Sequence, residues 1–214
     1  MWIGTDPRRR TLVTAKRLLD IVLSGIGLVL SSPLWAAIAA AIKFEDGGAV
    51  FYTQVRVGER GRPFDALKFR SMIPDAERGV GPVQASERDP RVTRVGRMLR
   101  ATAMDELPQL WNIFRGDMSF VGPRALRPDE IDAGTGGRSV SIQAIPGFTE
   151  RCAVQPGLTG IAQIYAPRDV SRRQKFRLDL LYIRRRTFLL DLKLIFVSFW
   201  ITMRGTWEAR ERKF

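Results

Sequence analysis

The sequence predicts an α+β fold that is mostly helical and carries a membrane-embedded helix near its N-terminus. Three observations support this prediction. Residues 18–42 form one long apolar run, residues 50–70 contain two β-prone runs around a turn, and most of the remaining pattern has helical periodicity. We therefore expect a small β-hairpin and amphipathic interfacial helices, packed on a cytosolic core.

The composition limits the partners and the chemistry. The chain has 214 residues, with 35 Lys and Arg against 22 Asp and Glu, which gives a formal net charge of +13. This excess predicts an anionic partner: nucleic acid, a phospholipid surface or a phosphorylated substrate. Cys152 is the only cysteine and there is no histidine, which excludes an internal disulfide, an imidazole base and a His-ligated metal. Any metal should be a hard, oxygen-liganded ion.

The apolar run divides the chain into a basic N-terminal segment, 1–17, a membrane helix, 18–42, and a cytosolic domain, 43–214. The run LLDIVLSGIGLVLSSPLWAAIAAAI contains one charged residue, Asp20, and about 20 apolar residues suffice to cross a bilayer. A cleavable signal peptide is an alternative, because small residues follow, but its apolar region is normally about 7 to 15 residues long. We expect the segment to stay attached.

Two features predict that this helix enters and leaves the membrane on the same face. Ser32 and Pro33 lie in its middle, and an interior proline removes a backbone hydrogen bond and bends a helix. The hydroxyls of Ser31 and Ser32 are close enough to satisfy freed carbonyl groups. Basic residues flank both ends, which the positive-inside rule places in the cytoplasm; they are Arg8, Arg9, Arg10, Lys16 and Arg17 before the run and Lys43, Arg56, Arg60, Arg62, Lys68 and Arg70 after it. A single kinked span is the alternative.

Asp20 follows Lys16 and Arg17 by four and three residues. On a helix these spacings bring side chains together. We therefore expect Asp20 to pair with these cations near the membrane interface, which suits an anchor better than a channel.

Residues 50–70, VFYTQVRVGERGRPFDALKFR, are expected to form the hairpin. In its second arm Leu67 and Phe69 alternate with Lys68 and Arg70, so the two cations should share one face of the strand. The segments 74–90 and 128–149 are rich in turn residues and predict loops, the second of them a possible lid.

Two further segments have helical spacing. Arg91, Arg94, Arg97 and Arg100 recur every third residue, which indicates one face of a helix; a solvated face is the simplest interpretation of such a run. Residues 178–204 form a basic and aromatic amphipathic pattern that Asp191 and Lys193 interrupt. We expect this pattern to lie on the membrane or to close the core rather than to span the bilayer.

Two adjacent carboxylates, Asp105 and Glu106, precede a helical pattern in MDELPQL. The ordinary explanation is that Asp105 caps the helix and Glu106 is a first-turn acid favoured by the helix dipole, with Pro108 tolerated in the first turn. The sequence contains no phosphate-binding loop G-x-x-x-x-G-K-[ST], no G-x-G-x-x-G turn and no D-x-D pair. The common nucleotide-binding folds are therefore not indicated.

Several long, collinear blocks resemble the bacterial sugar transferases, the monotopic phosphoglycosyl transferases. The blocks are KRLLDIV, SSP, FYTQVRVGERGRPFDALKFRSM, DPRVTRVGRMLR, MDELPQLWNIFRGDMSFVGPR, PGLTGIAQIY and LDLLYIRRRTFLLDLKLI. The resemblance covers nearly the whole chain. It departs from the family pattern at Gln155, where a basic residue is common, and at Thr187, where serine is usual. No extra N-terminal membrane helices are present, so the chain resembles the minimal catalytic form or an excised catalytic core.

The resemblance implies an enzyme of the bacterial inner membrane, held at its cytoplasmic face as a monotopic protein. The implied reaction transfers a sugar 1-phosphate from a UDP-sugar to polyprenyl (undecaprenyl) phosphate and releases UMP, as the first membrane step of surface glycan, exopolysaccharide or lipopolysaccharide synthesis. Membrane phospholipid is then a partner, nucleic acid is not, and a homodimer is possible. Neither the sugar nor the glycan pathway follows from the sequence.

The resemblance also implies roles for individual residues. Asp105 would attack the β-phosphorus of the UDP-sugar and form an aspartyl sugar phosphate, which the lipid phosphate then resolves. Asp105 and Glu106 would lie at an Mg²⁺ site, with Glu106 as the main ligand. Cationic side chains would bind phosphate groups; they are Arg100 and Arg124, with Lys68 and Arg70 behind them.

Two other functions remain open from the residues. A non-catalytic basic module could bind anionic lipid or nucleic acid through charge alone, and its acidic pair would then be a helix cap. A phospholipid-forming transferase acting on a CMP-activated donor is a second enzyme alternative. Release of UMP separates the proposed reaction from both.

Overall fold

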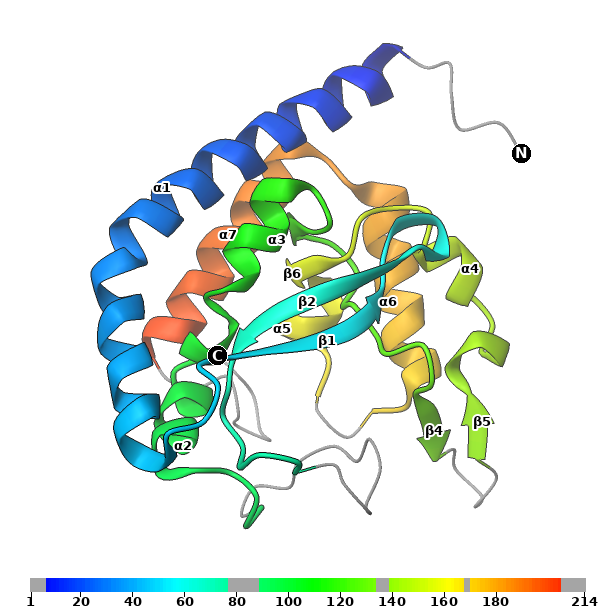
Figure 1. Ribbon diagram of the computed structural model, residues 1–214. Coiled ribbons are helices and arrows are strands. Elements are labelled where there is room, and N and C mark those ends of the chain that lie inside the picture. Colours follow the sequence, from blue (N-terminus) through cyan, green and yellow to red (C-terminus); the bar gives the residue numbers. More distant parts are fainter. Residues whose placement is uncertain (1–6, 77–88, 134–138, 168–169, 205–214) are drawn as a thin grey trace.

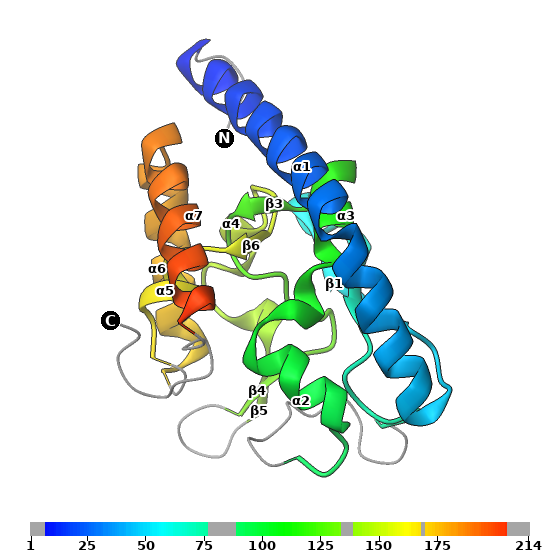
Figure 2. The ribbon, with the colours of Figure 1, turned by 90° about the vertical axis from the view of Figure 1, so that its left-hand side faces the viewer.

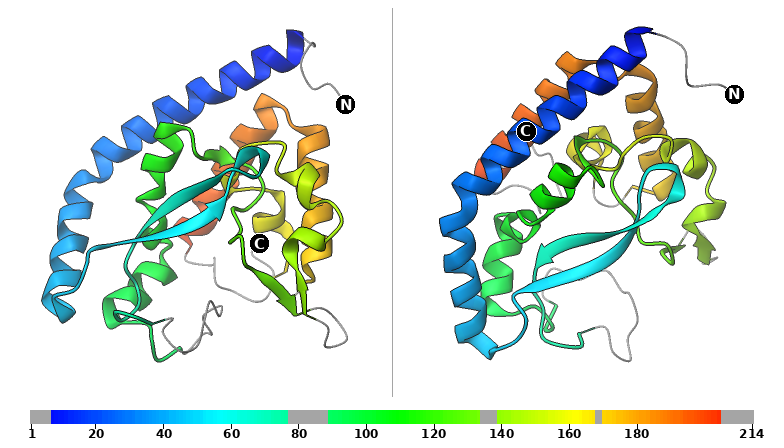
Figure 3. Two further views of the ribbon diagram at one scale, coloured as in Figure 1. Left: turned by 45° about the vertical axis from the view of Figure 1, so that its right-hand side comes forward. Right: turned by 45° about the horizontal axis from the view of Figure 1, so that its top comes forward.

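The computed structural model describes residues 7–76, 89–133, 139–167 and 170–204 (Figure 1). Helices dominate this part of the chain, and its strands form three separate two-stranded ladders. The mostly helical α+β prediction is therefore confirmed. One helix, α1 (Pro7–Asp46), runs along the outside of all the other elements (Figures 1 and 3).

Helix α1 is longer than the apolar run because both basic flanks continue it. Its segment Thr11–Asp46 is long and apolar enough to cross a membrane, and only 11% of its most apolar window is buried. The buried side of α1 packs on the rest of the protein through Ile38 and Ile42, while its outer side presents large apolar side chains. The latter include Leu18, Val22, Ile26, Val29 and Leu30.

Pro33 lies inside α1, which bends gradually along its length (Figure 1). Proline has no N–H, so the carbonyl of Val29 loses the donor that an ordinary residue at position 33 would supply. Ser32 Oγ donates to this carbonyl at 2.8 Å. The predicted compensation by Ser32 is confirmed, whereas Ser31 Oγ is buried without a hydrogen-bond partner among the described residues.

The predicted pairing of Asp20 takes a different form: Lys16 and Arg17 are close enough to act electrostatically on Asp20, but their hydrogen bonds go to other groups. Asp20 is 1% exposed, and its Oδ1 accepts a hydrogen bond from the Phe120 amide at 3.0 Å. Lys16 Nζ lies 2.8 Å from Asp191 Oδ2, and Arg17 donates to the carbonyls of Ile113 and Phe114 at the end of α3 (Gln109–Arg115). Tertiary partners therefore replace the local i, i+4 pair and fix the start of α1 to the domain.

The predicted hairpin is confirmed. Strands β1 (Phe51–Val57) and β2 (Pro63–Phe69) pair in antiparallel register, with Phe51 opposite Phe69, and the turn contains the 3₁₀ helix η1 (Glu59–Gly61). Phe69 is 1% exposed and packs under α1 with Ile38, Ile42 and Leu99. The opposite face of β2 carries Lys68.

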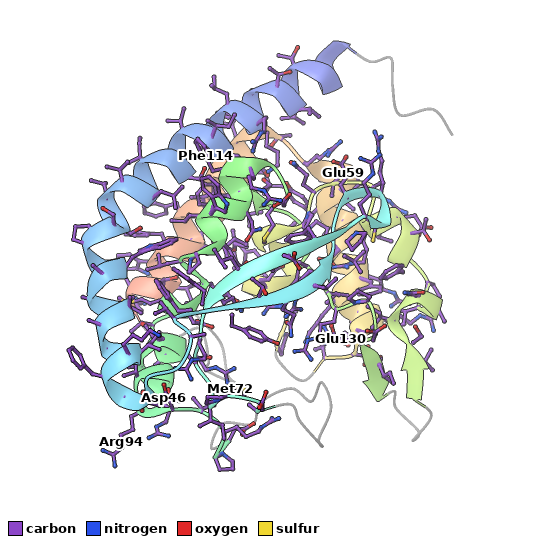
Figure 4. All side chains as sticks on the ribbon, viewed as in Figure 1. Asp46, Glu59, Met72, Arg94, Phe114 and Glu130 are labelled. Carbon is purple, nitrogen blue, oxygen red and sulfur yellow. The ribbon has the colours of Figure 1, made fainter. Side chains whose placement is uncertain are left out.

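Helix α2 (Arg94–Ala101) begins at Thr93, whose Oγ1 accepts from the Gly96 amide at 2.9 Å. Gly96 permits a close approach to the segment after β2, because a Cβ there would lie 2.0 Å from the Ser71 carbonyl oxygen. The 3₁₀ turn η2 (Met104–Glu106) and helix α3 (Gln109–Arg115) follow. Figure 4 shows Asp46 and Arg94 near one another at the lower end of α1, and Phe114 of α3 close to the middle of α1.

The remaining elements form the other half of the domain. Strand β3 (Ser119–Val121) pairs in parallel with β6 (Gly157–Thr159), and β4 (Ile131–Ala133) pairs antiparallel with β5 (Ser139–Ser141). The 3₁₀ turn η3 (Ile142–Ala144) and the helices α4 (Phe148–Arg151) and α5 (Ile161–Tyr165) are short. The predicted loop 128–149 thus contains regular structure, because Ile142, Ile145 and Phe148 pack against Phe176 of α6 (Arg172–Arg185). Most of the predicted loop 74–90 lies outside the described residues.

The basic and aromatic C-terminal pattern forms two helices, α6 (Arg172–Arg185) and α7 (Phe188–Met203). Thr187 caps α7, since its Oγ1 accepts from the Leu190 amide at 3.2 Å, so threonine serves here as serine would. One side of α7 packs in the core through Leu194 and Ile201. The other side exposes Leu189, Leu192, Phe196, Phe199, Trp200 and Met203. Figure 2 shows α1, α3 and α7 on the same face of the molecule.

Candidate active site

The acidic pair lies where the hairpin, α2 and α3 meet. Asp105 and Glu106 belong to the turn η2, which enters α3 through two further helical residues, Leu107 and Pro108. Ala103, immediately before the turn, has φ 55° and ψ 18°, a left-handed conformation that is unfavourable for an alanine. This reversal directs the chain from α2 back across β2 and presents both carboxylates to that strand.

The structure contradicts the interpretation of Asp105 as a helix cap. The residues in the cap positions are Ala103 for η2 and Pro108 for α3, and neither makes a side-chain capping bond. Asp105 is 8% exposed and faces Lys68, with 3.8 Å between Asp105 Oδ2 and Lys68 Nζ. A buried carboxylate that does not cap a helix requires another explanation, because burial of a charge is unfavourable unless it is paired.

The pKa values of the two carboxyl groups are shifted in opposite directions. Burial raises the pKa of Asp105 to about 6; Lys68 acts against this rise and the neighbouring Glu106 adds to it. Burial also acts to raise the pKa of Glu106, but Lys68 and Arg124 outweigh it and lower that pKa to about 2. Paired titratable groups with separated pKa values are typical of catalytic sites.

Lys68 bridges the pair. Its Nζ donates to Glu106 Oε1 at 2.6 Å and lies 3.8 Å from Asp105 Oδ2. The alternation within β2 accounts for this placement, since Phe69 points into the core and Lys68 to the other side. An ammonium between two carboxylates keeps both available in their charged form near neutral pH.

Arginines surround the pair at longer range. Arg124 Nη2 lies 3.8 Å from Glu106 Oε1, and its side chain is half exposed. Arg100 donates through Nε to Ser71 Oγ at 3.0 Å and acts electrostatically on Asp105. The other arginines of the every-third-residue run turn away: Arg94 and Arg97 are exposed, and Arg91 forms a two-pronged ion pair with Asp89.

Arg70 is not among these side chains. Strand β2 ends at Phe69, so the alternation that was expected to place Arg70 beside Lys68 stops one residue short. The Arg70 guanidinium forms a fork with the Asp46 carboxylate at the end of α1 and donates to the Ala49 carbonyl. The structure thus places Arg70 at the junction between α1 and the hairpin.

Arg56 and Arg172 also lie near Arg124, although the sequence analysis did not assign either of them to the site. Burial, together with the neighbouring Arg124 and Arg127, lowers the pKa of Arg56 to about 10, while Glu106 acts in the opposite direction. Burial and Arg124 also lower the pKa of Arg172. Repulsion among guanidinium groups favours an anion between them. The signal available in the sequence was the β-strand alternation of Gln54 and Arg56, which turns both side chains to one face.

The donor set fits a magnesium ion that is shared with a substrate. Among the described residues no group of three or more His, Cys, Asp or Glu side chains gathers in one place. The protein therefore offers the two carboxylates of Asp105 and Glu106, and Glu106 is ionised at any ordinary pH. Mg²⁺ is commonly bound by one or two carboxylates together with substrate phosphates and waters, so this pair is sufficient.

Comparison with known proteins gives a consistent family. The model of the family described as bacterial sugar transferase matches residues 11–205. The chain is 37% identical over 196 residues to the exopolysaccharide production protein ExoY of Rhizobium meliloti, covering 85% of this chain and 82% of that protein. Residues 11–205 include all of α1 except its first four residues, the acidic pair and α7.

Two other relatives are longer than this chain. The UDP-glucose:undecaprenyl-phosphate glucose-1-phosphate transferase of Klebsiella pneumoniae is 43% identical over 188 residues, covering 86% of this chain and 39% of that protein. The UDP-N-acetylgalactosamine-undecaprenyl-phosphate N-acetylgalactosaminephosphotransferase of Aeromonas hydrophila is 39% identical over 184 residues, covering 85% and 42%. The chain thus spans about two fifths of these two proteins. Their names differ in the sugar.

Proposed function

Because the chain belongs to the bacterial sugar transferase family, we propose that it is a phosphoglycosyl transferase that moves a sugar 1-phosphate from a UDP-sugar to polyprenyl (undecaprenyl) phosphate. UMP is the released product, and the reaction is a first membrane step in exopolysaccharide or related glycan synthesis. The observation that carries the proposal is the buried Asp105, paired with Lys68 beside an ionised Glu106 and surrounded by arginines.

The proposed chemistry has two displacements at one phosphorus atom. A carboxylate oxygen of Asp105 attacks the β-phosphorus of the UDP-sugar, and the bond from this phosphorus to the bridging oxygen breaks, so UMP leaves with the electron pair. A phosphate oxygen of the lipid then attacks the same phosphorus and releases Asp105. The lipid phosphate is already an anion, so neither step needs an imidazole base.

The surrounding residues would hold charge during both displacements. Lys68 keeps Asp105 ionised and contacts the transferred phosphoryl group, and Arg124 with Arg56 and Arg100 would bind the phosphates of the donor. A magnesium ion held by Glu106 and Asp105 would offset the charge of the diphosphate. Preorganised cations of this kind are the main source of catalysis in phosphoryl transfer.

The membrane arrangement that we propose is re-entrant and on the cytoplasmic face. The part of α1 that precedes Pro33 bonds to the domain through Lys16, Arg17 and Asp20. The part that follows Pro33 packs on the same domain through Ile38 and Ile42. A helix whose two ends contact one folded unit does not place those ends on opposite sides of a bilayer. Helices α1 and α7 both lie on the face turned to the viewer in Figure 2, and both carry exposed large apolar side chains, so this face would enter the lipid.

The experiment that tests the proposal measures nucleotide release from a panel of UDP-sugars, with and without polyprenyl phosphate. We expect UMP only with the cognate donor, sustained turnover only when the lipid phosphate is present, and a covalent sugar phosphate on the protein when donor is supplied alone. Intact mass measures that adduct. Release of CMP from a CMP-activated donor, or salt-sensitive lipid binding without any turnover, would replace the proposal by one of its two alternatives.

A further inference from the structure

The side chain of Asn112 in α3 occupies the free edge of β2. One edge of β2 pairs with β1. At the other edge the Leu67 amide donates to Asn112 Oδ1 at 2.9 Å, and Asn112 Nδ2 donates to the Asp65 carbonyl at 2.7 Å. Alternate residues of a strand direct their backbone groups to the same edge, so one amide side chain supplies the acceptor and the donor that a third strand would supply.

Every polar atom of this side chain is used. Nδ2 donates a second hydrogen bond to Asp117 Oδ2 at 3.1 Å, and Asn112 is 2% exposed. The backbone carbonyl of Asn112 accepts hydrogen bonds from the amides of Gly116 and Asp117, and these two bonds close the C-terminal end of α3. A carboxamide has one oxygen and two N–H donors, whereas aspartate has no donor and glutamine is one methylene longer. The position therefore requires asparagine.

The two elements that Asn112 joins carry the reacting groups. Lys68 follows Leu67 on β2, and Asp105 and Glu106 lie on the turn that leads into α3. We propose that Asn112 is a positioning residue for the reaction proposed above: it fixes β2 against α3 and so sets Lys68 opposite Asp105 and Glu106. This inference rests on the proposed function for its catalytic consequence, and on the hydrogen bonds of Asn112 for its geometry.

A double-mutant cycle separates positioning from general stability. If Asn112 acts through Lys68, Asn112→Ala should lower kcat about 10- to 100-fold in the wild-type background and by less than about twofold when Lys68→Met is already present. The matched control is Ile113→Val, which alters the next residue of α3, also fully buried, without a bond to β2. Its small effect on kcat should be the same in both backgrounds. Equal losses from Asn112→Ala with and without Lys68→Met would overturn the inference.

A second variant identifies which bond matters. Asn112→Asp with Asp117→Asn exchanges the donor and acceptor between these two side chains and keeps a bond between them, while the donor to the Asp65 carbonyl is lost. We expect this double variant to remain as slow as Asn112→Ala. The oxygen at position 112 still accepts from the Leu67 amide in this variant, so recovery of wild-type kcat would mean that the bond to the Asp65 carbonyl does not set the rate.

A third readout does not depend on turnover. In folded Asn112→Ala protein the Leu67 amide should lose protection from hydrogen exchange, and Lys68 should react faster with an amine-selective acylating reagent, while Ile113→Val leaves both unchanged. Unchanged Lys68 reactivity in Asn112→Ala would overturn the inference even if the enzyme is active. If wild type released no UMP from any donor, the proposed function would fail, and this readout would still decide whether Asn112 positions Lys68.

Discussion

Asp105 is held in a state that opposes the stability of the fold. A carboxylate that is 8% exposed and whose pKa is raised to about 6 is less stable ionised in the protein than in water. A cap or a surface acid would not need this arrangement. A nucleophile benefits from it, because a poorly solvated anion next to Lys68 loses little solvation when it attacks phosphorus.

Asp105→Asn distinguishes a nucleophile from a structural acid. The amide has nearly the same shape but does not attack phosphorus, so we expect turnover to fall at least about 10³-fold and the covalent sugar phosphate to disappear, while the protein stays folded. Glu106→Gln should keep a detectable adduct and lower the rate with a weaker response to Mg²⁺. The measurements are UMP release and intact mass. A fully active Asp105→Asn enzyme would exclude Asp105 as the nucleophile.

The pH dependence of stability should change in the same variant. The folded pKa of Asp105 is about 6 and lies above the ordinary aspartate pKa of 3.8, so the native state binds the proton more tightly and the ionised group destabilises the fold above about pH 6. Asp105→Asn should therefore raise the free energy of unfolding by about 1 to 3 kcal/mol at pH 8 and change it little near pH 4. Unfolding in detergent with EDTA measures this difference. A larger gain at pH 4 than at pH 8 would contradict the assignment.

Among the secondary-structure elements, α2 places one of its arginines, Arg100, near the acidic pair and directs its other arginines away from it. Arg100 lies in the last turn, bonds to Ser71 and acts on Asp105. Arg97, one turn earlier, donates instead to the carbonyl of Val92, which precedes the helix. Equal spacing along the sequence thus conceals unequal roles. The close approach at Gly96 fixes the rotation of α2 that produces this difference.

Arg100→Ala and Arg97→Ala form a matched pair within this helix. A charge-assisted contact to a substrate phosphate contributes about 1.5 to 3 kcal/mol, so Arg100→Ala should lower kcat/KM for the UDP-sugar about 10- to 100-fold. Arg97→Ala should change it less than about threefold. Steady-state kinetics in one detergent system give both values. If both variants lose similarly little kcat/KM, the arginines of α2 form only a solvated basic face.

The bend in α1 gives a second test at this scale. Ser32→Ala removes the hydroxyl that bonds to the carbonyl of Val29, and should cost about 1 kcal/mol of unfolding free energy. Adding Pro33→Ala should recover most of this loss, because an N–H at position 33 can bond to the same carbonyl. Ser31→Ala is the control with no expected loss, since that hydroxyl has no partner among the described residues. Additive losses in the double variant would show that Ser32 does not compensate for Pro33.

Local sequence patterns predicted which helices and strands form better than they predicted which residues those elements contact. Three local patterns were sufficient: the apolar run, the paired β-prone runs, and Pro33 with Ser32 before it. The structure contains the corresponding features, which are α1, the hairpin and the hydrogen bond of Ser32. Lys16 bonds to Asp191, which is 175 positions away, and no periodicity within one helix contains that information. The same reason explains the inward Arg56 and the ion pair of Arg70 with Asp46. For the site, the acidic pair Asp105 and Glu106 stood out in the sequence itself, whereas the resemblance selected Lys68, Arg70, Arg100 and Arg124. The structure brings all of these together except Arg70, which pairs with Asp46.

At the scale of the whole molecule, a buried polar network connects α1 to three other elements. Lys16 Nζ bonds to Asp191 of α7 and to the Val121 carbonyl of β3, and Tyr182 of α6 donates to Asp191 Oδ1 at 2.8 Å. Asp191 is 1% exposed. Because the loss of one member of a buried ion pair is strongly unfavourable, this network fixes the direction in which α1 leaves the domain. The proposed membrane arrangement follows from that direction.

Accessibility of the two ends of α1 tests this arrangement. Val13 and Phe44 are 51% and 90% exposed, one near each end of the helix, so Val13→Cys and Phe44→Cys, each made in a Cys152→Ser background, should perturb packing little. A re-entrant helix keeps both thiols on the cytoplasmic side, where a membrane-impermeant maleimide labels them only after the membrane is opened. A kinked single span would instead leave one of them reactive in intact cells with a permeabilised outer membrane, and the contacts of both helix ends with one domain would then not persist in the bilayer. Labelling of neither thiol from outside and of both from inside is the result that we expect.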